Sequence, residues 1–473
     1  MAKPYKYEVF THIIEQQILI GTLRAKDRLP SVREIRSLYK LSMTSVQNGF
    51  EYLVMKGLVM SSPGSGYFVR EVKDENIPDI QTHFSPVIRD ESFMKNMILT
   101  SQQTSDVSSF NHAVPGDLLI PQKLILRTMQ EVIREKGATL LRYYPSNGLE
   151  LLRRLIAQQM AKYGCTLNPD ELIITDGALQ ALTIALRSVT AAGDIVAVES
   201  PCVFSVLEVL SSLGLRVVEI PVHYRHGFDV EYFRKICTGH HVRALIVTPN
   251  FHNPTGILMK DEVKKELLAI AGDHQMCIIE NDMYSDLYFG EERPRCIKSF
   301  DTKGIVMMYS SFSKTLAPGI RLGWLYAGEW YSRSERVRFV LGRSVSPVYQ
   351  ELVLKLLQGS SYERHLRTFR KKLEEQATRV LDVVRRSFPE GSYFHRPEGG
   401  YSIWGQLPEG VPMEKFWRYC DRHQILFTPG YTFSFADQYP HHFRIIFAER
   451  ISSESIALLE KTGVKAHELL LER

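Results

Sequence analysis

Residues 311–324 read Ser311-Phe312-Ser313-Lys314-Thr315-Leu316-Ala317-Pro318-Gly319-Ile320-Arg321-Leu322-Gly323-Trp324, and this segment is the most informative one in the chain. It places one lysine, Lys314, among small hydroxyl residues, with an arginine seven positions later. A lysine whose pKa is lowered by burial can form a Schiff base with an aldehyde. Ser311, Ser313 and Arg321 offer hydroxyls and a planar guanidinium to phosphate oxygens. The stretch therefore predicts a site for pyridoxal phosphate, although a Ser-Lys pair alone also fits a solvated loop.

Two upstream segments each end a predicted buried strand with polar residues. The apolar run 244–248 is followed by His252-Asn253-Pro254-Thr255-Gly256, and the run 276–280 is followed by Asp282 and Tyr284. Ligands of open α/β sheets bind at the carboxyl edge of the strands. Asp282 can keep a pyridine nitrogen protonated there, and Asn253 and Tyr284 can hydrogen-bond the phenolic oxygen of the ring.

A third upstream segment predicts an anion site. Leu172-Ile-Ile-Thr175 reads as a strand, Gly177 as a turn, and Ala178 as the start of a helix. Backbone N–H groups at a helix N-terminus point at an anion, and the helix dipole favours its charge. Together these segments predict one α/β domain with a site at its sheet edge.

From about Phe110 to the C-terminus, these motifs resemble the class I aminotransferases, the fold type I family of pyridoxal phosphate enzymes. The resemblance implies that Lys314 forms the Schiff base, that Asp282 partners the pyridine nitrogen, and that Asn253 and Tyr284 partner the ring oxygen. Lys314, Asp282 and Tyr284 would be the catalytic residues. The residues implied at the phosphate are Gly177, Ala178, Ser311, Ser313 and Arg321.

Three further positions follow from this resemblance. Phe204 stands where the family stacks an aromatic ring on the cofactor, although its spacing also fits a core phenylalanine. Arg444 matches the arginine that clamps a substrate's α-carboxylate, or else is a surface arginine on an edge strand. Tyr143 matches a tyrosine that reaches the phosphate of the neighbouring subunit, which implies a homodimer. Ala113 stands where the family usually has a glycine, so the substrate is not inferred.

The first 70 residues differ chemically from the rest. They contain ten Lys or Arg against five Asp or Glu. This excess equals the net charge of +5 of the whole chain, so the remaining residues are neutral in sum. An excess of positive charge attracts a polyanion.

The pattern of this segment predicts a winged helix-turn-helix. Residues 9–19 keep a helical period that Gly21 ends. Ser31 and Glu34 form a capping-box pattern for a second helix, and Ser42 can cap a third one that runs to about Lys56. Two short strands around a Gly-rich tip follow, as in a wing. A small structural helical module is the alternative interpretation.

This segment resembles the DNA-binding domain of the GntR family of bacterial regulators, through Leu29-Pro30-Ser31, Arg33, Ser42-Met43-Thr44 and Gly64-Ser65-Gly66. Its fusion to an aminotransferase-like domain resembles the MocR or GabR subfamily. The residues implied to contact DNA are Arg33, Ser42, Thr44, Ser45, Gln47 and Gly66. Met43 stands where family members often have an arginine, and Gln47 and Asn48 favour adenine over guanine.

The sequence thus predicts three parts: a GntR-type DNA-binding domain at 1–70, an extended linker at 71–109, and a pyridoxal phosphate domain at 110–473. It contains no run of about 18 uncharged apolar residues and no signal-peptide pattern, so we expect a cytoplasmic protein that does not enter a membrane. The six cysteines lack metal-site spacing, so we expect reduced thiols and no metal.

Two functions remain at this point. In the first, a homodimeric regulator binds a double-stranded DNA operator and senses an amino acid or amine, which forms an external aldimine with the cofactor on Lys314. In the second, the chain is an active aminotransferase for an α-amino acid, with Lys314 as the base. We favour the regulator, because a metabolic aminotransferase has no use for residues 1–70.

Overall fold

A computed structural model of the chain divides into two compact units, Met1–Ile77 and Pro78–Arg473. It describes residues 8–19, 23, 26–55, 58–62, 66–70, 108–224, 226–436, 438–449 and 451–472. Gly21, Lys56, the tip Pro63-Gly64-Ser65 and most of the predicted linker lie outside the described residues.

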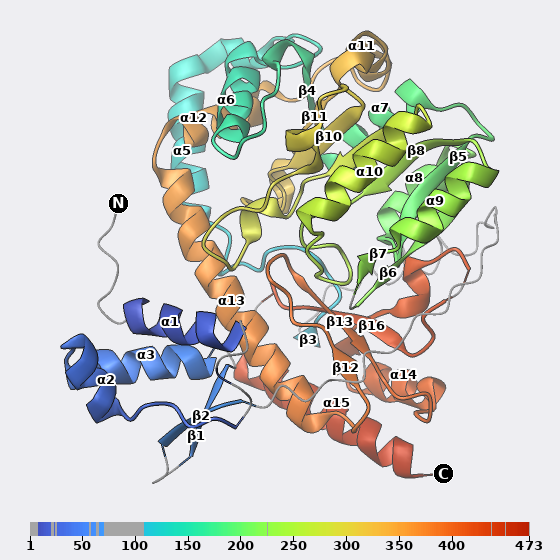
Figure 1. Ribbon diagram of the computed structural model, residues 1–473. Helices are drawn as coiled ribbons and strands as arrows, with labels where there is room; N and C mark the ends of the chain where they lie inside the picture. The colour runs from blue at the N-terminus through green and yellow to red at the C-terminus, as the bar shows by residue number, and fades with distance from the viewer. Residues whose placement is uncertain are drawn as a thin grey trace. The chain divides into compact units, whose positions relative to one another are not determined.

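In its described residues, the first unit consists of three helices and a two-stranded hairpin (Figure 1). These are α1 (Glu8–Leu19), α2 (Val32–Tyr39), α3 (Met43–Met55), β1 (Val59–Ser62) and β2 (Gly66–Val69). The hairpin is antiparallel, with Val59 opposite Val69. The order of the elements is the one that the sequence predicts for a winged helix-turn-helix.

Local capping explains where the helices of this unit begin. The Ser31 hydroxyl accepts the Glu34 N–H at 3.3 Å, and the Glu34 carboxylate accepts the Ser31 N–H at 2.6 Å. These are the two bonds of a capping box. The Ser42 hydroxyl accepts the Ser45 N–H at 3.0 Å at the start of α3. Behind the caps, Phe50 of α3 is fully buried and stacks on Tyr67 of β2 with ring centroids 4.0 Å apart.

An eight-stranded sheet forms the centre of the second unit, in the order β4-β11-β10-β9-β8-β5-β6-β7. The strands are β4 (Leu172–Thr175), β5 (Ile195–Ser200), β6 (Arg216–His223), β7 (Gly227–Phe228), β8 (Val242–Val247), β9 (Cys277–Asn281), β10 (Val306–Ser311) and β11 (Gly323–Tyr326). β11 is antiparallel to β10 and β4, and β7 is antiparallel to β6. The pairs from β6 through β5, β8 and β9 to β10 are parallel.

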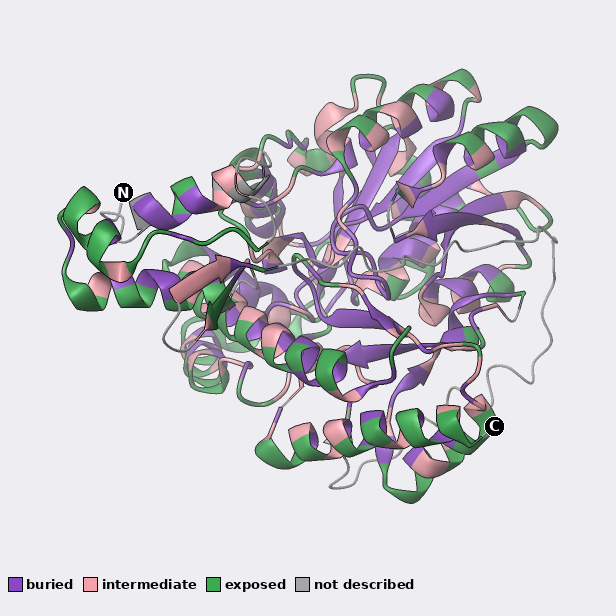
Figure 2. Cartoon of the chain, turned by 60° about the horizontal axis from the view of Figure 1, so that its bottom comes forward, coloured by how far each residue is buried: buried purple, intermediate pink, exposed green. Residues whose placement is uncertain are grey.

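Helices cover both faces of this sheet (Figure 1). They are α5 (Gln122–Lys136), α6 (Glu150–Ala161), α7 (Ala178–Val189), α8 (Phe204–Ser212), α9 (Val230–Gly239), α10 (Asp261–Asp273), α11 (Tyr331–Val340) and α12 (Pro347–Gln358). Val196 and Val198 of β5 pack in the core of α7 and α8, whereas Ala197 between them packs with α9 and α10. This alternation buries both faces, which explains the continuous apolar runs of the strands. Figure 2 shows the sheet as a buried layer.

A smaller antiparallel sheet follows in the chain, in the order β12-β13-β16-β15. Its strands are β12 (Tyr393–Phe394), β13 (Ser402–Gln406), β15 (Thr428–Pro429) and β16 (His442–Ile446). The helices of this region are α13 (Ser361–Ser387), α14 (Met413–Arg422) and α15 (Ser453–Leu471). β3 (Ser108–Ser109) pairs in parallel with β14 (Ile425–Leu426). The pairing of β16 with strands on both sides places Arg444 in the interior of this sheet.

The large sheet brings the predicted motifs to one edge. Because β8, β9 and β10 are parallel neighbours, the segments that follow them start at the same side of the sheet. Asn253 follows β8, Tyr284 follows β9, and Lys314 follows β10. The predicted mixed α/β fold class with an N-terminal helix-turn-helix unit is confirmed.

Candidate functional site

One cavity of about 240 Å³ gathers several of the residues that the sequence predicts around a cofactor and its substrate. The predicted residues that line it are Ala178, Phe204, Asn253, Tyr284, Lys314 and Arg444. They come from segments up to 266 positions apart in the sequence, Ala178 to Arg444. The fold therefore assembles at one place what the sequence presents as separate motifs.

Lys314 has the surroundings of a nucleophilic amine. Its Nζ donates a hydrogen bond to the carbonyl oxygen of Ala113 at 2.5 Å. Burial, together with the smaller effects of the positive charges of Arg444 and Arg321, lowers the pKa of Lys314 to about 8. A neutral amine attacks an aldehyde and an ammonium does not, so the lowered pKa favours Schiff-base chemistry at neutral pH.

Tyr284 and Asn253 form a polar pair beside the lysine. The Asn253 Nδ2 group donates to the Tyr284 hydroxyl at 3.3 Å. Burial raises the pKa of Tyr284 to about 12, against the smaller opposing effects of Arg444 and Asn253. Tyr284 thus stays protonated at neutral pH, and its O–H is available as a donor to a ligand oxygen.

Arg444 is a buried cation rather than a surface arginine, since only 1% of its surface is exposed. Its guanidinium donates to the carbonyl of Asn111 at 2.6 Å, to Thr428 at 3.1 Å and to Asn253 at 3.0 Å. Its Nε is buried without a hydrogen-bond partner, and no described carboxylate pairs with it. Burial lowers the pKa of Arg444 to about 10, with an opposing effect of Tyr284. A buried cation without a counter-ion is suited to an anionic ligand group.

Phe204 is the first residue of α8, and its side chain lines the cavity instead of filling the core. The Arg444 guanidinium lies 5.9 Å from its ring centroid. The interpretation of Phe204 as an ordinary core residue does not fit this position.

The residues predicted at the phosphate lie near one another at the start of α7. Gly177 caps the helix with a φ of 84°, and a Cβ at this position would lie 2.9 Å from Nη2 of Arg321. Arg321 donates to the carbonyl of Asp176 at 3.0 Å. The Ser311 hydroxyl donates to the Ser313 hydroxyl at 3.0 Å. Ser311, Ser313, Gly177 and Arg321 do not themselves line the 240 Å³ cavity, whereas Ala178 of α7 does.

Asp282 does not take the position that the sequence predicts for it. Its carboxylate binds the Arg293 guanidinium and the Ser285 hydroxyl, and it lines a different cavity. Burial raises the pKa of Asp282, while Arg293 and Ser285 act in the opposite direction. Its neighbour Asn281, the last residue of β9, lines the cavity of Lys314 instead. Adjacent residues at a strand end point to opposite sides, and the sequence does not reveal which one faces the site.

Two more lining residues escaped prediction as site residues. Asn111 and His112 line the cavity from the segment that precedes Ala113. Burial and the charge of Arg444 both lower the pKa of His112, so its imidazole is a neutral group beside that arginine. The polar pair Asn111-His112 within an otherwise apolar segment was the available signal.

Tyr143 lies outside the cavity. Its side chain is 73% exposed, and the Arg343 guanidinium lies 4.3 Å from its ring centroid. Its predicted contact with the site of a neighbouring subunit stays a prediction.

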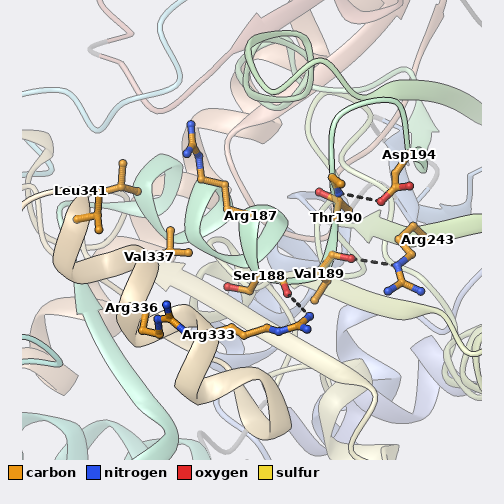
Figure 3. A pocket seen from close by; sticks show the side chains of 12 residues that line it. Arg187, Ser188, Val189, Thr190, Asp194, Arg243, Arg333, Arg336, Val337 and Leu341 are labelled. Carbon is orange, nitrogen blue, oxygen red and sulfur yellow. Dashed lines mark hydrogen bonds between the residues drawn. The ribbon is translucent and has the colours of Figure 1, made fainter.

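A second, larger cavity of about 540 Å³ lies between α7 and α11 and has a different chemistry (Figure 3). It is lined by the arginines Arg187, Arg243, Arg333 and Arg336. Arg243 donates to the carbonyl of Val189 at 3.1 Å, as Figure 3 shows. All four arginines are exposed, and no lysine lines this cavity. It is therefore not a site for an aldehyde cofactor.

In the first unit, the side chains predicted to contact DNA lie on the surface. Arg33, Ser42, Thr44 and Gln47 are exposed, and Ser45 is partly buried. Ser42 also caps α3, and its hydroxyl lies 2.8 Å from that of Ser45. Gly66 begins β2 with a φ of 108°, a conformation that favours glycine. The exposed face of α3 is thus polar at the positions that a recognition helix uses.

No helix in the described ranges is long and apolar enough to cross a membrane. In the same ranges, no group of three or more acidic, histidine or cysteine side chains is arranged to hold a metal ion.

Two family models match the chain. The model for bacterial regulatory proteins of the gntR family matches residues 6–69, and the model for aminotransferase class I and II matches residues 115–460. The fold and the site therefore define a helix-turn-helix unit joined to an aminotransferase-type unit.

Curated relatives match this chain over most of their length. YdcR of Escherichia coli, described as an uncharacterized HTH-type transcriptional regulator, is 32% identical over 93% of this chain and 94% of its own length. YjiR of the same organism, described in the same words, is 30% identical over 97% of this chain and 98% of its own length. The HTH-type transcriptional regulator NorG of Staphylococcus aureus is 26% identical over 86% of this chain and 92% of its own length.

Solved aminotransferases share the fold of the larger unit. A kynurenine aminotransferase of Pyrococcus horikoshii superposes with a TM-score of 0.75 at 25% identity, covering 81% of this chain and 96% of its own. LysN of Thermus thermophilus, an α-aminoadipate aminotransferase, has a TM-score of 0.73 at 26% identity, over 81% and 96% of the two chains. The chain belongs to the family of HTH-type transcriptional regulators in which a GntR-type domain is fused to an aminotransferase class I and II domain.

Proposed function

We propose that the chain is a homodimeric regulator of the MocR type, which binds operator DNA through its winged helix and senses an amino acid or amine through pyridoxal phosphate at Lys314. The observation that carries this proposal is the presence of a lysine of lowered pKa and a buried arginine without a counter-ion in one cavity. An amine-binding and a carboxylate-binding group at one place suit an α-amino acid.

The residues present fit pyridoxal phosphate. Lys314 would hold its aldehyde carbon, Tyr284 and Asn253 its ring oxygen, and Phe204 a ring face. Gly177, Arg321 and the N–H groups at the start of α7 would hold its phosphate, since the Arg321 guanidinium lies beside Gly177 and the N–H groups of a helix N-terminus point at an anion. When bound, the cofactor supplies an aldehyde carbon that can exchange one amine for another.

The proposed regulation requires that the amine has different affinities for different arrangements of the protein. An amine that occupies the cavity can change DNA binding only if it binds one arrangement of the protein better than another. The exposed polar face of α3 and the positive charge of the first 70 residues would give the affinity for double-stranded DNA. Such a regulator acts where the chromosome is, in the bacterial cytoplasm.

A homodimer is supported by apolar side chains that the second unit leaves exposed. They include Leu118, Leu126, Ile133, Leu141, Tyr143, Leu151, Leu179, Phe339 and Val340. Large exposed apolar surfaces mark interfaces between proteins. We expect sedimentation to give a dimer at micromolar concentration, and a monomer there would contradict this part of the proposal.

The aminotransferase alternative rests on the same cavity, because Lys314 can also move a proton and Arg444 can orient a substrate.

One experiment distinguishes the regulator from the aminotransferase. Absorbance spectra and electrophoretic binding of the chain's own upstream DNA are followed while the protein is titrated with a panel of amino acids and amines. A regulator is expected to show a lasting spectral change with altered DNA affinity and no keto acid. Release of keto acid with unaltered DNA binding would establish the enzyme instead.

A further inference from the structure

Two neighbouring polar side chains at the end of β9 have opposite surroundings. Asn281 is 2% exposed and lines the cavity of Lys314, while Asp282 is 4% exposed and lines a separate cavity with Arg293. The acidic group and the neutral group thus face different partners.

Asp282 is held away from the cavity by an ion pair. Its carboxylate binds the Arg293 guanidinium, and both side chains are almost completely buried. Arg293 also binds Asp286 at 2.7 Å, and the Asp282 backbone N–H donates to the Tyr309 carbonyl at 2.9 Å. To turn toward Lys314, Asp282 would have to leave the buried Arg293 with Asp286, a partly exposed carboxylate, as its remaining ion-pair partner, which is unfavourable.

Asn281 has a free donor on the cavity side. Its Oδ1 accepts the Met283 N–H at 3.2 Å, which fixes the amide. In the described ranges no group accepts a hydrogen bond from its Nδ2. A neutral N–H group donates to an unprotonated pyridine nitrogen, whereas a carboxylate would keep that nitrogen protonated.

The geometry of the ring indicates which cofactor atom Asn281 faces. In pyridoxal phosphate the aldehyde carbon and the ring nitrogen lie at opposite ends of the ring, and the phenolic oxygen is next to the aldehyde. Lys314 takes the aldehyde end and Tyr284 with Asn253 the oxygen. Asn281 is the remaining polar side chain that β9 supplies to the cavity.

We propose that Asn281, and not Asp282, contacts the ring nitrogen of pyridoxal phosphate and leaves this nitrogen unprotonated. This inference rests on the proposed function, because it presupposes that the cofactor binds. An unprotonated ring draws electrons less strongly from the α-carbon of a bound amino acid. Removal of the α-proton is then slow, so the cavity retains an amine instead of converting it, which suits a sensor.

The direct test uses the full-length protein loaded with pyridoxal phosphate that carries ¹⁵N in its ring. The ¹⁵N chemical shift is measured for the wild type, for Asn281→Asp and for Asp282→Asn. We expect the shift of an unprotonated nitrogen in the wild type and in Asp282→Asn, and that of a protonated nitrogen in Asn281→Asp. A protonated nitrogen in the wild type would overturn the inference, and this result does not depend on the folding of either variant.

A second readout is the exchange of the α-proton of a bound amino acid with deuterium oxide. Asn281→Asp is expected to speed this exchange by about tenfold or more, and Asp282→Asn to leave it unchanged. If the exchange rate fell in Asp282→Asn and stayed the same in Asn281→Asp, Asp282 and not Asn281 would be the residue that contacts the ring nitrogen. If the wild type takes up no cofactor, the proposed function fails first, which distinguishes the two failures.

Discussion

The two units of this chain use their polar residues in opposite ways. In the first unit, Arg33, Thr44 and Gln47 are exposed, and residues 1–70 of this unit carry a net charge equal to the +5 of the whole chain. In the second unit, Arg444 and Asn253 are buried around a cavity, and the charges of the unit nearly balance. An exposed cationic surface suits a long polyanion, while a few buried groups suit one small ligand.

The largest effect is expected from Lys314→Ala, because it removes the one amine in the cavity. The variant should lose completely the visible absorbance band of a cofactor bound to lysine. Lys123→Ala, an exposed lysine of α5, is the matched control and should keep the band. An undiminished band in Lys314→Ala would refute the assignment of the cofactor site.

Salt should act strongly on the first unit and weakly on the second. If the dimer contacts about six or more phosphates, DNA affinity should fall about a thousandfold between about 50 and about 200 mM salt. The affinity for an amino acid should change little, because buried charges are screened less. Electrophoretic shifts and absorbance titrations at the same salt concentrations measure both. If salt weakened DNA binding and amino-acid binding to the same degree, the proposed difference between the two units would be wrong.

Arg444→Lys should weaken the binding of an α-amino acid by about ten- to a hundredfold, because a lysine cannot make the bidentate contact to a carboxylate. The binding of the corresponding amine, which lacks the carboxylate, should weaken much less. Arg338→Lys is the matched control, since Arg338 is also buried but binds the carbonyl of Ile174 outside the cavity. Equal losses for both ligands would show that Arg444 acts on the fold and not on the carboxylate.

The pH dependence of cofactor uptake should report the lowered pKa of Lys314. Because only the neutral amine attacks the aldehyde, the rate of uptake by the cofactor-free protein should rise about tenfold per pH unit and level off above a pKa of about 8. Stopped-flow absorbance measures this rate. If the rate of uptake kept rising up to the ordinary lysine pKa of about 10.4, burial would not lower the pKa of Lys314.

Much of this architecture could be predicted because local signals agree with the fold. The capping box of Ser31 and Glu34 and the cap at Ser42 mark helix starts that involve only neighbouring residues. The apolar runs before Asn253, Tyr284 and Lys314 indicate parallel strands, and the carboxyl ends of such strands meet at one edge. Sequence alone was therefore enough to place these three residues together.

The features that escaped prediction depend on contacts that the sequence does not encode locally. Whether Asn281 or Asp282 faces the cavity is decided by the ion pair of Asp282 with Arg293, 11 positions away. The burial of Arg444 depends on the pairing of β16 with strands on both sides. The predicted role of Tyr143 would depend on a second chain.

In the proposed regulator, an amine captured at Lys314 changes the affinity of the first unit for DNA. The most direct measurement compares DNA affinity, with and without a saturating amine that alters the absorbance spectrum, in the wild type and in Lys314→Ala. The amine should change the DNA affinity of the wild type and leave that of the variant unchanged. The same change in both proteins, or no change in either, would contradict it.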